Sequence, residues 1–219
     1  MKLSPDILLS AYSQGAFPMA SDVDDPEIGW YCPELRGQLS IPNMHIPRRL
    51  RKNVRQMKIG GRPYGIRINS NFPKVVKSCA AITSSRSETW INSKILDAYC
   101  ELHKKGHAHS VECWQDDSLV GGLYGVSIGG AFFGESMFSI ARDASKVSLV
   151  HLVAHLSYSG FRILDTQFTN DHLEQFGVFE VPHEEYMRSL VPVLSLPCKF
   201  DVGQVNEKEV IAKYFEINP

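Results

Sequence analysis

A carboxylate and an amide interrupt an apolar segment late in the chain. The segment "FRILDTQF", residues 161–168, is typical of a buried strand, yet it carries Asp165 and Gln167. Residues two positions apart on a strand point to the same face, so the two polar groups are expected to lie side by side. Burying them is unfavourable unless they are paired. They are therefore candidates to contact a ligand from a rigid strand.

A glutamate lies in a second apolar segment. Glu135 stands in "GGAFFGESMFS", residues 129–139, where glycines permit a bulge or a close backbone approach. One interpretation is an exposed residue at a strand end. The other is that a long helix connects neighbouring strands, so that Glu135 faces one cleft with Asp165 and Gln167. Such a cleft would have apolar walls, as small-ligand sites do. The wall residues would be Leu123, Phe132, Met137, Leu149, Leu152 and Leu164.

Two histidines have the spacing of a metal-binding pair on a helix. His151 and His155 lie four residues apart, but Leu152 stands where a zinc hydrolase needs a glutamate as base. We therefore favour packing on a helix face and predict no metal site.

The order of the predicted elements indicates a mixed α/β fold. Apolar residues at Phe72, Val75, Val76 and Cys79 have helical spacing. From about residue 70 the order is α-α-β-β-β-α-β-α, which is similar to that of the acetyltransferase-like (GNAT) fold with its mixed sheet. We expect a small N-terminal domain over residues 1–60 and a GNAT-like catalytic domain over 61–219. The predicted helices are 5–14, 72–79, 92–106, 143–160, 170–177 and 183–191, the strands lie within 37–42, 109–139 and 161–168, and the last residues are expected to form a partly mobile tail.

The junction before the long helix argues against coenzyme A as the acyl donor. That junction is "SIARDASK", which lacks the successive glycines that could bind a pyrophosphate. A GNAT-like domain without this loop needs another acyl donor.

One segment concentrates the basic residues. Residues 48–67 carry eight Lys or Arg and no acid, in a chain of net charge -1. A solvated helix face is one interpretation, and contact with a phosphate backbone is the other.

Composition places the chain among ordinary globular proteins. It is 43% hydrophobic and 21% charged over 219 residues. No segment has the roughly 18–20 apolar residues of a membrane span, so no membrane contact is predicted. The five scattered cysteines lack a CxxC pair, which favours reduced thiols and a cytoplasmic location.

Seven motifs in order resemble the leucyl/phenylalanyl-tRNA–protein transferase family. They are "AYSQGAFPM", "TWI", "GHAHSVECW", "LVGGLYGV", "GESMFS", "ASK" and "LDTQFTNDHLEQFG", between about Leu8 and Leu190. The resemblance implies transfer of Leu or Phe from leucyl-tRNA or phenylalanyl-tRNA to proteins with N-terminal Lys or Arg, which marks them for N-end-rule degradation. It also implies that no metal or organic cofactor is needed. We expect the protein to act as a monomer.

The resemblance also implies roles for single residues. Asp165, Gln167 and Glu135 fall on catalytic positions, and we expect Asp165 and Gln167 to hydrogen-bond the attacking amine directly. Trp90 and Met19 fall on the site of the terminal adenosine, although better-known members have Trp in place of Met19. The apolar wall residues named above would hold the Leu or Phe side chain. The basic segment would contact the tRNA through Arg48, Arg49, Arg51, Lys52, Arg55 and Lys58.

Two rival interpretations stay open at this point. One is a different acyl or aminoacyl transferase on the same fold. The other is a tRNA-binding module that has lost catalysis, which predicts damage at Asp165, Gln167 or Glu135, yet all three are intact.

Overall fold

A seven-stranded mixed sheet forms the centre of the molecule. The computed structural model describes residues 3–23, 25, 27–82, 88–201 and 205–218. The strands of this sheet are ordered β11-β3-β10-β9-β8-β7-β6, and of the pairings described only β9–β10 is parallel. The strands are β3 (Leu35–Leu39), β6 (Gly65–Ile68), β7 (Ala108–Gln115), β8 (Ser118–Ile128), β9 (Ala131–Ser139), β10 (Ile163–Gln167) and β11 (Phe179–Pro182). The predicted mixed α/β fold is confirmed.

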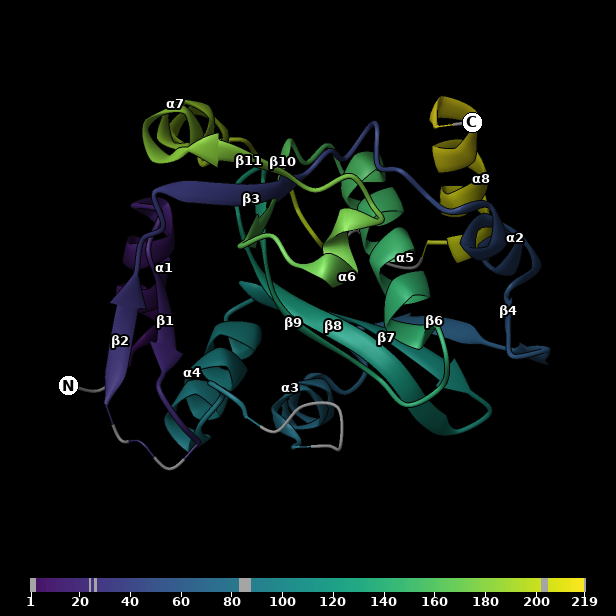
Figure 1. Ribbon diagram of the computed structural model, residues 1–219, viewed down its shortest axis with the longest axis horizontal. Helices are drawn as coiled ribbons and strands as arrows, with labels where there is room; N and C mark the ends of the chain where they lie inside the picture. Colours follow the sequence, from purple (N-terminus) through teal and green to yellow (C-terminus); the bar gives the residue numbers. More distant parts are fainter. Residues whose placement is uncertain (1–2, 24, 26, 83–87, 202–204, 219) are drawn as a thin grey trace.

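Helices cover both faces of this sheet (Figure 1). One face carries α5 (Ala144–Tyr158), which connects β9 to β10 as a parallel pair requires. The other face carries α3 (Phe72–Ala80) and α4 (Ser93–Lys104). Each face therefore has its own apolar core, and the predicted order from residue 70 onward is confirmed.

A second layer lies outside α5. It consists of α2 (Arg48–Gln56) and α8 (Glu207–Ile217), which both pack on α5 and on each other. Val210, Ile211, Tyr214 and Phe215 of α8 are buried. The prediction of a mobile tail is therefore wrong for residues 207–217, because four apolar side chains at helical spacing dock this segment on the core.

The N-terminal segment lies at the opposite end of the molecule from α8 (Figure 1). It contains α1 (Pro5–Ser13), β1 (Phe17–Ala20) and β2 (Ile28–Tyr31), and β1 and β2 pair as an antiparallel ribbon. The next strand, β3, pairs with β10 and β11 and so belongs to the large sheet. The domain boundary at residue 60 stays a prediction. The strand β3 lies before that boundary but pairs with β10 and β11, which lie after it.

The remaining elements are short or lie at the edges. They are β4 (Lys58–Ile59), β5 (Arg62–Pro63), α6 (Asp171–Glu174) and α7 (His183–Val193).

The contact between β8 and β9 leaves no room for a side chain at Gly125. A Cβ atom there would lie 2.3 Å from the carbonyl oxygen of Phe133 and 2.4 Å from the ring of Phe132. We expect Gly125→Ala to lower the free energy of unfolding by about 1–3 kcal/mol, measured by denaturant titration. Gly65→Ala in β6 is the control, because no atom lies within 4 Å of its Cβ position. Equal stability of the two variants would contradict the prediction.

Candidate active site

Two bulges lie side by side where β9 and β10 separate. In β9, Gly134 and Ser136 face consecutive residues of β8, so Glu135 is the extra residue. In β10, Asp165 and Gln167 face consecutive residues of β3, so Thr166 is the extra residue. Bulges turn side chains out of the regular alternation. The bulge in β10 therefore replaces the regular strand geometry from which the sequence predicted that Asp165 and Gln167 point to the same face.

The separated strands are bridged by side chains rather than by backbone. The parallel pairing of β9 with β10 ends at Phe133 and Asp165. Beyond this point the Gln167 Nε2 donates to Glu135 Oε1 over 2.8 Å. The predicted proximity of Glu135 and Gln167 is therefore confirmed.

Gln167 adopts a backbone conformation that is unfavourable for its residue type. Its φ angle is +65°, in the left-handed region. Its N–H donates to Asp165 Oδ1 over 2.7 Å, which holds this conformation. Strain of this kind persists only where surrounding contacts enforce it, and it is common at functional sites.

Two tyrosines from different helices enclose Glu135. Tyr12 of α1 donates to Glu135 Oε1 over 2.6 Å, and Tyr99 of α4 donates to Oε2 over 2.8 Å. The two hydroxyl groups also contact each other. Three oxygen–oxygen contacts thus form a closed ring, but two tyrosines supply only two protons. All three contacts are hydrogen bonds only when Glu135 carries a proton as well.

The electrostatics of the site agree with this proton count. Burial raises the pKa of Glu135 to about 8, against the opposing effect of the hydrogen bonds from Tyr12 and Tyr99. Burial also raises the pKa of both tyrosines well above the usual value, so both stay protonated. Glu135 is therefore largely protonated near neutral pH.

Asp165 is paired inside the protein. Its side chain has no exposed surface, and it accepts from Arg36 Nε at 2.9 and 3.0 Å and from Arg36 Nη2 at 2.8 Å. The Tyr186 hydroxyl donates to Asp165 Oδ2 over 2.5 Å. The expectation that Asp165 contacts the attacking amine directly stays a prediction; in this structure its oxygens are buried and hydrogen-bonded within the protein. Asp165 Oδ1 also accepts the backbone N–H of Gln167.

Four residues of this site were missed by sequence reasoning. Tyr12, Arg36, Tyr99 and Tyr186 come from four different elements; only Tyr12 lies in one of the quoted motifs, "AYSQGAFPM", and no role was assigned to it there. One signal was available, namely that a carboxylate in the middle of an apolar strand requires a partner. The sequence alone does not select that partner among its basic residues.

The six predicted wall residues form part of the core on the α5 side of the sheet. Met137 is half-buried, and the other five are buried. Leu123 lies opposite Met137, and Phe132 lies opposite Leu164. Two surface hollows lie away from these residues, one beside α1 and one beside α8. The walls are thus packed together, with Met137 as the member nearest to solvent.

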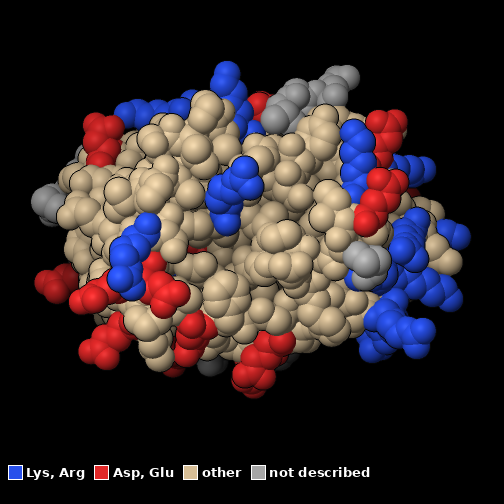
Figure 2. Space-filling view, turned by 90° about the horizontal axis from the view of Figure 1, so that it is seen from above, with Lys and Arg blue, Asp and Glu red and all other residues tan. Residues whose placement is uncertain are grey.

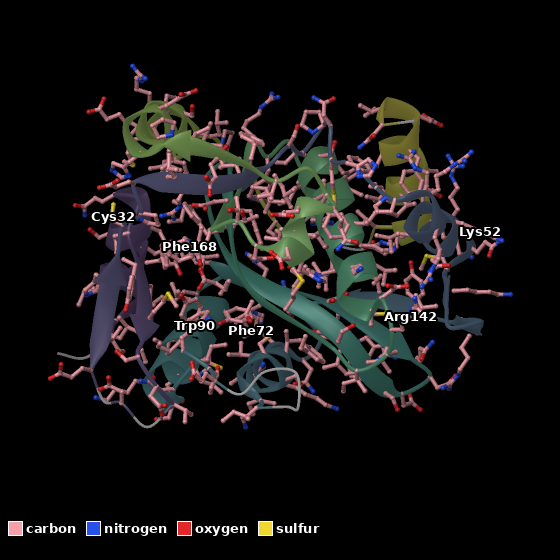
Figure 3. All side chains as sticks on the ribbon, in the orientation of Figure 1. Cys32, Lys52, Phe72, Trp90, Arg142 and Phe168 are labelled. Carbon is pink, nitrogen blue, oxygen red and sulfur yellow. The ribbon has the colours of Figure 1, made fainter. Side chains whose placement is uncertain are left out.

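The segments that carry Met19 and Trp90 are joined by a backbone hydrogen bond. The Ala20 N–H donates to the Trp90 carbonyl over 3.3 Å, and both Met19 and Trp90 are half-buried against the same core. Figure 3 shows Trp90 and Phe168, the residue after Gln167, on the side of the molecule that carries α1 and β1. The structure therefore brings the segments of the two predicted adenosine residues together, on the side of the molecule where Phe168 lies.

The predicted tRNA-contacting residues lie in α2 and at the start of β4. Arg49 pairs with Asp143 over 2.7 Å, whereas Arg51 donates to the Asn218 carbonyl over 2.8 Å. Arg48, Arg49, Lys52, Arg55 and Lys58 are exposed. Figure 2 shows Lys and Arg gathered at the end of the molecule where α2 lies, and Figure 3 places Lys52 far from Trp90. The structure does not bring the basic helix to Gln167.

The paired histidines of α5 make contacts within the fold. His151 meets the Tyr64 hydroxyl at 3.2 Å and Glu207 at 3.2 Å, and His155 meets the Phe200 carbonyl at 2.6 Å. In the part of the chain that the structure describes, no three potential ligands gather in the way that a metal ion needs. No helix among the described residues has the length and apolar character needed to cross a bilayer.

Comparison with protein families gives two matches along the chain. The profile described as "Leucyl/phenylalanyl-tRNA protein transferase" matches residues 38–191. The profile described as "Leucyl/phenylalanyl-tRNA protein transferase N-terminal domain" matches residues 1–34. Together the two matches include Tyr12, Glu135, Asp165 and Gln167. Residues 35–37, among them Arg36, lie between the two matches.

Proposed function

Because the chain belongs to the leucyl/phenylalanyl-tRNA protein transferase family and is thus an aminoacyltransferase, we propose that it moves Leu or Phe from charged tRNA to the N-terminal Lys or Arg of acceptor proteins. The product would carry a new N-terminal Leu or Phe and so be marked for degradation. We place the reaction in the cytoplasm, where charged tRNA is found, and the protein acts as a monomer. The parallel β9–β10 pair connected by α5 supports a GNAT-like catalytic domain.

The observation that carries this proposal is the bridge between Gln167 and Glu135. The side-chain amide of Gln167 and the carboxyl group of Glu135 meet over 2.8 Å where two strands separate, and the buried Asp165 accepts the backbone N–H of Gln167. Such a site suits a cationic acceptor that also presents an amine.

The proposed reaction is aminolysis of an ester. The α-amine nitrogen attacks the aminoacyl carbonyl carbon, the bond from that carbon to the ribose 3′-oxygen breaks, and the leaving oxygen takes up a proton. An α-amine has a pKa of about 7.7–8.0, so an appreciable fraction is neutral at physiological pH. Positioning can contribute roughly 7–11 kcal/mol to such a step. In this proposal the Gln167 amide orients the amine, and Asp165 acts by holding Gln167.

Glu135 is the proposed partner of the acceptor's cationic side chain. A charge-assisted hydrogen bond to Arg or Lys would replace the proton that Glu135 otherwise carries. Acceptor binding would then release a proton below pH 8.

This gives a pH dependence with a definite sign. Since burial raises the pKa of Glu135 to about 8, protonated Glu135 predominates below that pH and must be deprotonated before it pairs. We expect the dissociation constant of an Arg-initiated peptide to fall as pH rises toward 8 and to level off above it, measured by calorimetry. Glu135→Gln is the control, since the peptide's own amine titrates equally with both proteins. An identical pH dependence in both proteins would contradict the prediction.

The donor would lie against the other predicted residues. The adenosine would rest beside Met19 and Trp90, and the Leu or Phe side chain would enter beside Met137, whose half-buried position supports this role. Leu and Phe branch at or beyond Cγ, whereas Ile and Val branch at Cβ and would meet the walls early. Entry requires the packed wall residues to move apart.

The basic helix would contact the tRNA backbone away from the transferred residue. We expect Arg48→Ala and Lys52→Ala each to weaken tRNA binding regardless of sequence and to lower the slope of log affinity against log salt by about 1. Filter binding at several salt concentrations measures this. Lys105→Ala, an exposed lysine at the end of α4, is the control and should leave the slope unchanged. Unchanged slopes for both α2 variants would exclude this contact.

One assay tests the proposed function as a whole. The pure protein is incubated with leucyl-tRNA or phenylalanyl-tRNA and a short peptide that begins with Arg. The expected product is the peptide extended by one Leu or Phe, detected by mass spectrometry. A peptide that begins with Asp should stay unmodified, and acetyl-CoA should not serve as donor. Binding of charged tRNA without any product would refute the proposed transfer and favour a binding module.

A further inference from the structure

Arg36 is buried completely among the residues of the candidate site. It lies in β3, and its side chain is among the largest in the protein without exposed surface. The guanidinium lies between the rings of Phe17 and Tyr186, at 4.8 and 4.9 Å from their centroids. These rings leave only the guanidinium edges for hydrogen bonds.

Those edges connect three parts of the chain. Nε and Nη2 hold both oxygens of Asp165 in β10, and Nη1 donates to the Gly15 carbonyl over 2.7 Å. Gly15 lies between α1, which supplies Tyr12, and β1, which carries Met19. Arg36 therefore joins β10 to the segment between α1 and β1. Tyr12 on one side of this segment contacts Glu135, the proposed acceptor partner, and Met19 on the other side belongs to the proposed adenosine site.

Stability alone does not explain such a residue. A buried ion pair often contributes no more to stability than apolar side chains of similar size would. Here, however, Asp165 Oδ1 also accepts the N–H of Gln167, and Gln167 in turn reaches Glu135. Without its fork-shaped partner, Asp165 would keep only the Tyr186 hydroxyl on Oδ2 and the Gln167 N–H on Oδ1, and it could rotate more freely, because a single fork fixes both oxygens at once.

We propose that Arg36 is a positioning residue for aminoacyl transfer, whose guanidinium fixes Asp165 so that the bulge in β10 presents Gln167 to Glu135. Arg36 also supplies the positive charge of this otherwise acidic centre. The groups that face Glu135 are Tyr12, Tyr99, Asp165 and Gln167, and the electrostatic effect of Arg36 lowers the pKa of Glu135 while that of Asp165 raises it. This inference rests on the proposed function.

The first test removes the side chain and then supplies its head group. We expect Arg36→Ala to lower kcat by about 100-fold, the effect of misplacing a reacting group by about 1 Å. Its profile of kcat/KM for the acceptor should shift to higher pH, since the charge that favours ionised Glu135 is lost. Added guanidinium at millimolar concentration should recover part of kcat and reverse the shift, whereas urea, which is planar but neutral, should do neither.

A second variant covers the case in which Arg36→Ala does not fold. Arg36→Lys keeps the charge but loses the fork, so we expect a folded protein whose kcat falls at least about tenfold while its pH profile stays in place. Arg162→Ala, an exposed arginine next to β10, is the control for both variants and should keep wild-type kcat.

The outcomes separate this inference from the proposed function. If the wild-type protein transfers nothing, the proposed function fails before any variant is compared. If the wild type transfers and either folded variant, Arg36→Ala or Arg36→Lys, keeps wild-type kcat, only the positioning role of Arg36 is overturned. Equal rescue of Arg36→Ala by guanidinium and urea would also overturn it, because cavity filling would then suffice.

Discussion

Gln167→Gly is expected to lose transfer activity without losing stability. Glycine adopts the φ of +65° found at this position freely, so the variant sheds strain of roughly 1 kcal/mol while it loses one side-chain hydrogen bond of similar size. The backbone N–H that donates to Asp165 stays in place. Loss of the amide should lower kcat by about 100- to 1000-fold, as removal of a preorganised hydrogen-bonding group does.

Gln167→Ala provides the matched comparison. It removes the same amide but keeps the strain, so we expect equal loss of kcat and a free energy of unfolding about 1 kcal/mol below that of Gln167→Gly. Single-turnover transfer and denaturant unfolding measure the two quantities separately. A glycine variant with more than a tenth of wild-type kcat would show that the amide is dispensable.

Glu135→Gln is expected to change which acceptor the enzyme prefers. A charge-assisted hydrogen bond contributes about 1.5–3 kcal/mol, so KM for an Arg-initiated peptide should rise about 10- to 100-fold. A peptide that begins with citrulline, which has the shape of arginine without its charge, should be affected far less. The wild-type preference for arginine over citrulline should therefore nearly disappear, as competition between the two peptides would measure.

Glu112 of β7 allows a control with a second buried glutamate. Its carboxylate accepts from Ser110 and from Trp114 in the same strand and not from any residue of the candidate site. Glu112→Gln is expected to alter stability and to keep the preference for arginine. If both variants kept that preference, Glu135 would not be the acceptor's partner.

Sequence reasoning located α1, the helices α3 to α7, the strand β3 and the strands β7 to β10, because their signals are local. It missed α2, α8 and the short strands β1, β2, β4, β5, β6 and β11. Apolar spacing, caps and glycine stops identified these helices, and the polar interruption at Asp165 marked the strand that carries two residues of the candidate site. The meeting of Glu135 with Gln167 also followed, because a long helix between two strands places them next to each other. These inferences need only short segments and the general rules for connecting them.

The environment of these groups could not be predicted in the same way. Arg36 stands in a five-residue strand, where a lone arginine is more often exposed, and its partner is 129 residues away. Tyr12 and Tyr99 lie on apolar helix faces, and only the packing of α1 against α4 turns their hydroxyl groups toward Glu135. The φ angle of Gln167 arises from the bulge, which depends on register with β3 and has no sequence signal of its own.

The position of β3 between β10 and β11 has a consequence for synthesis on the ribosome. Both neighbours of β3 are translated long after it, and Arg36 precedes Asp165 by 129 residues. At about 5–20 residues per second, the ribosome needs roughly 6–26 s to supply that carboxylate. Contacts between such distant segments also form slowly in refolding. A nascent chain that ends before β10 therefore has an incomplete sheet and an Arg36 without its carboxylate partner, and the candidate site can assemble only once that strand has been made.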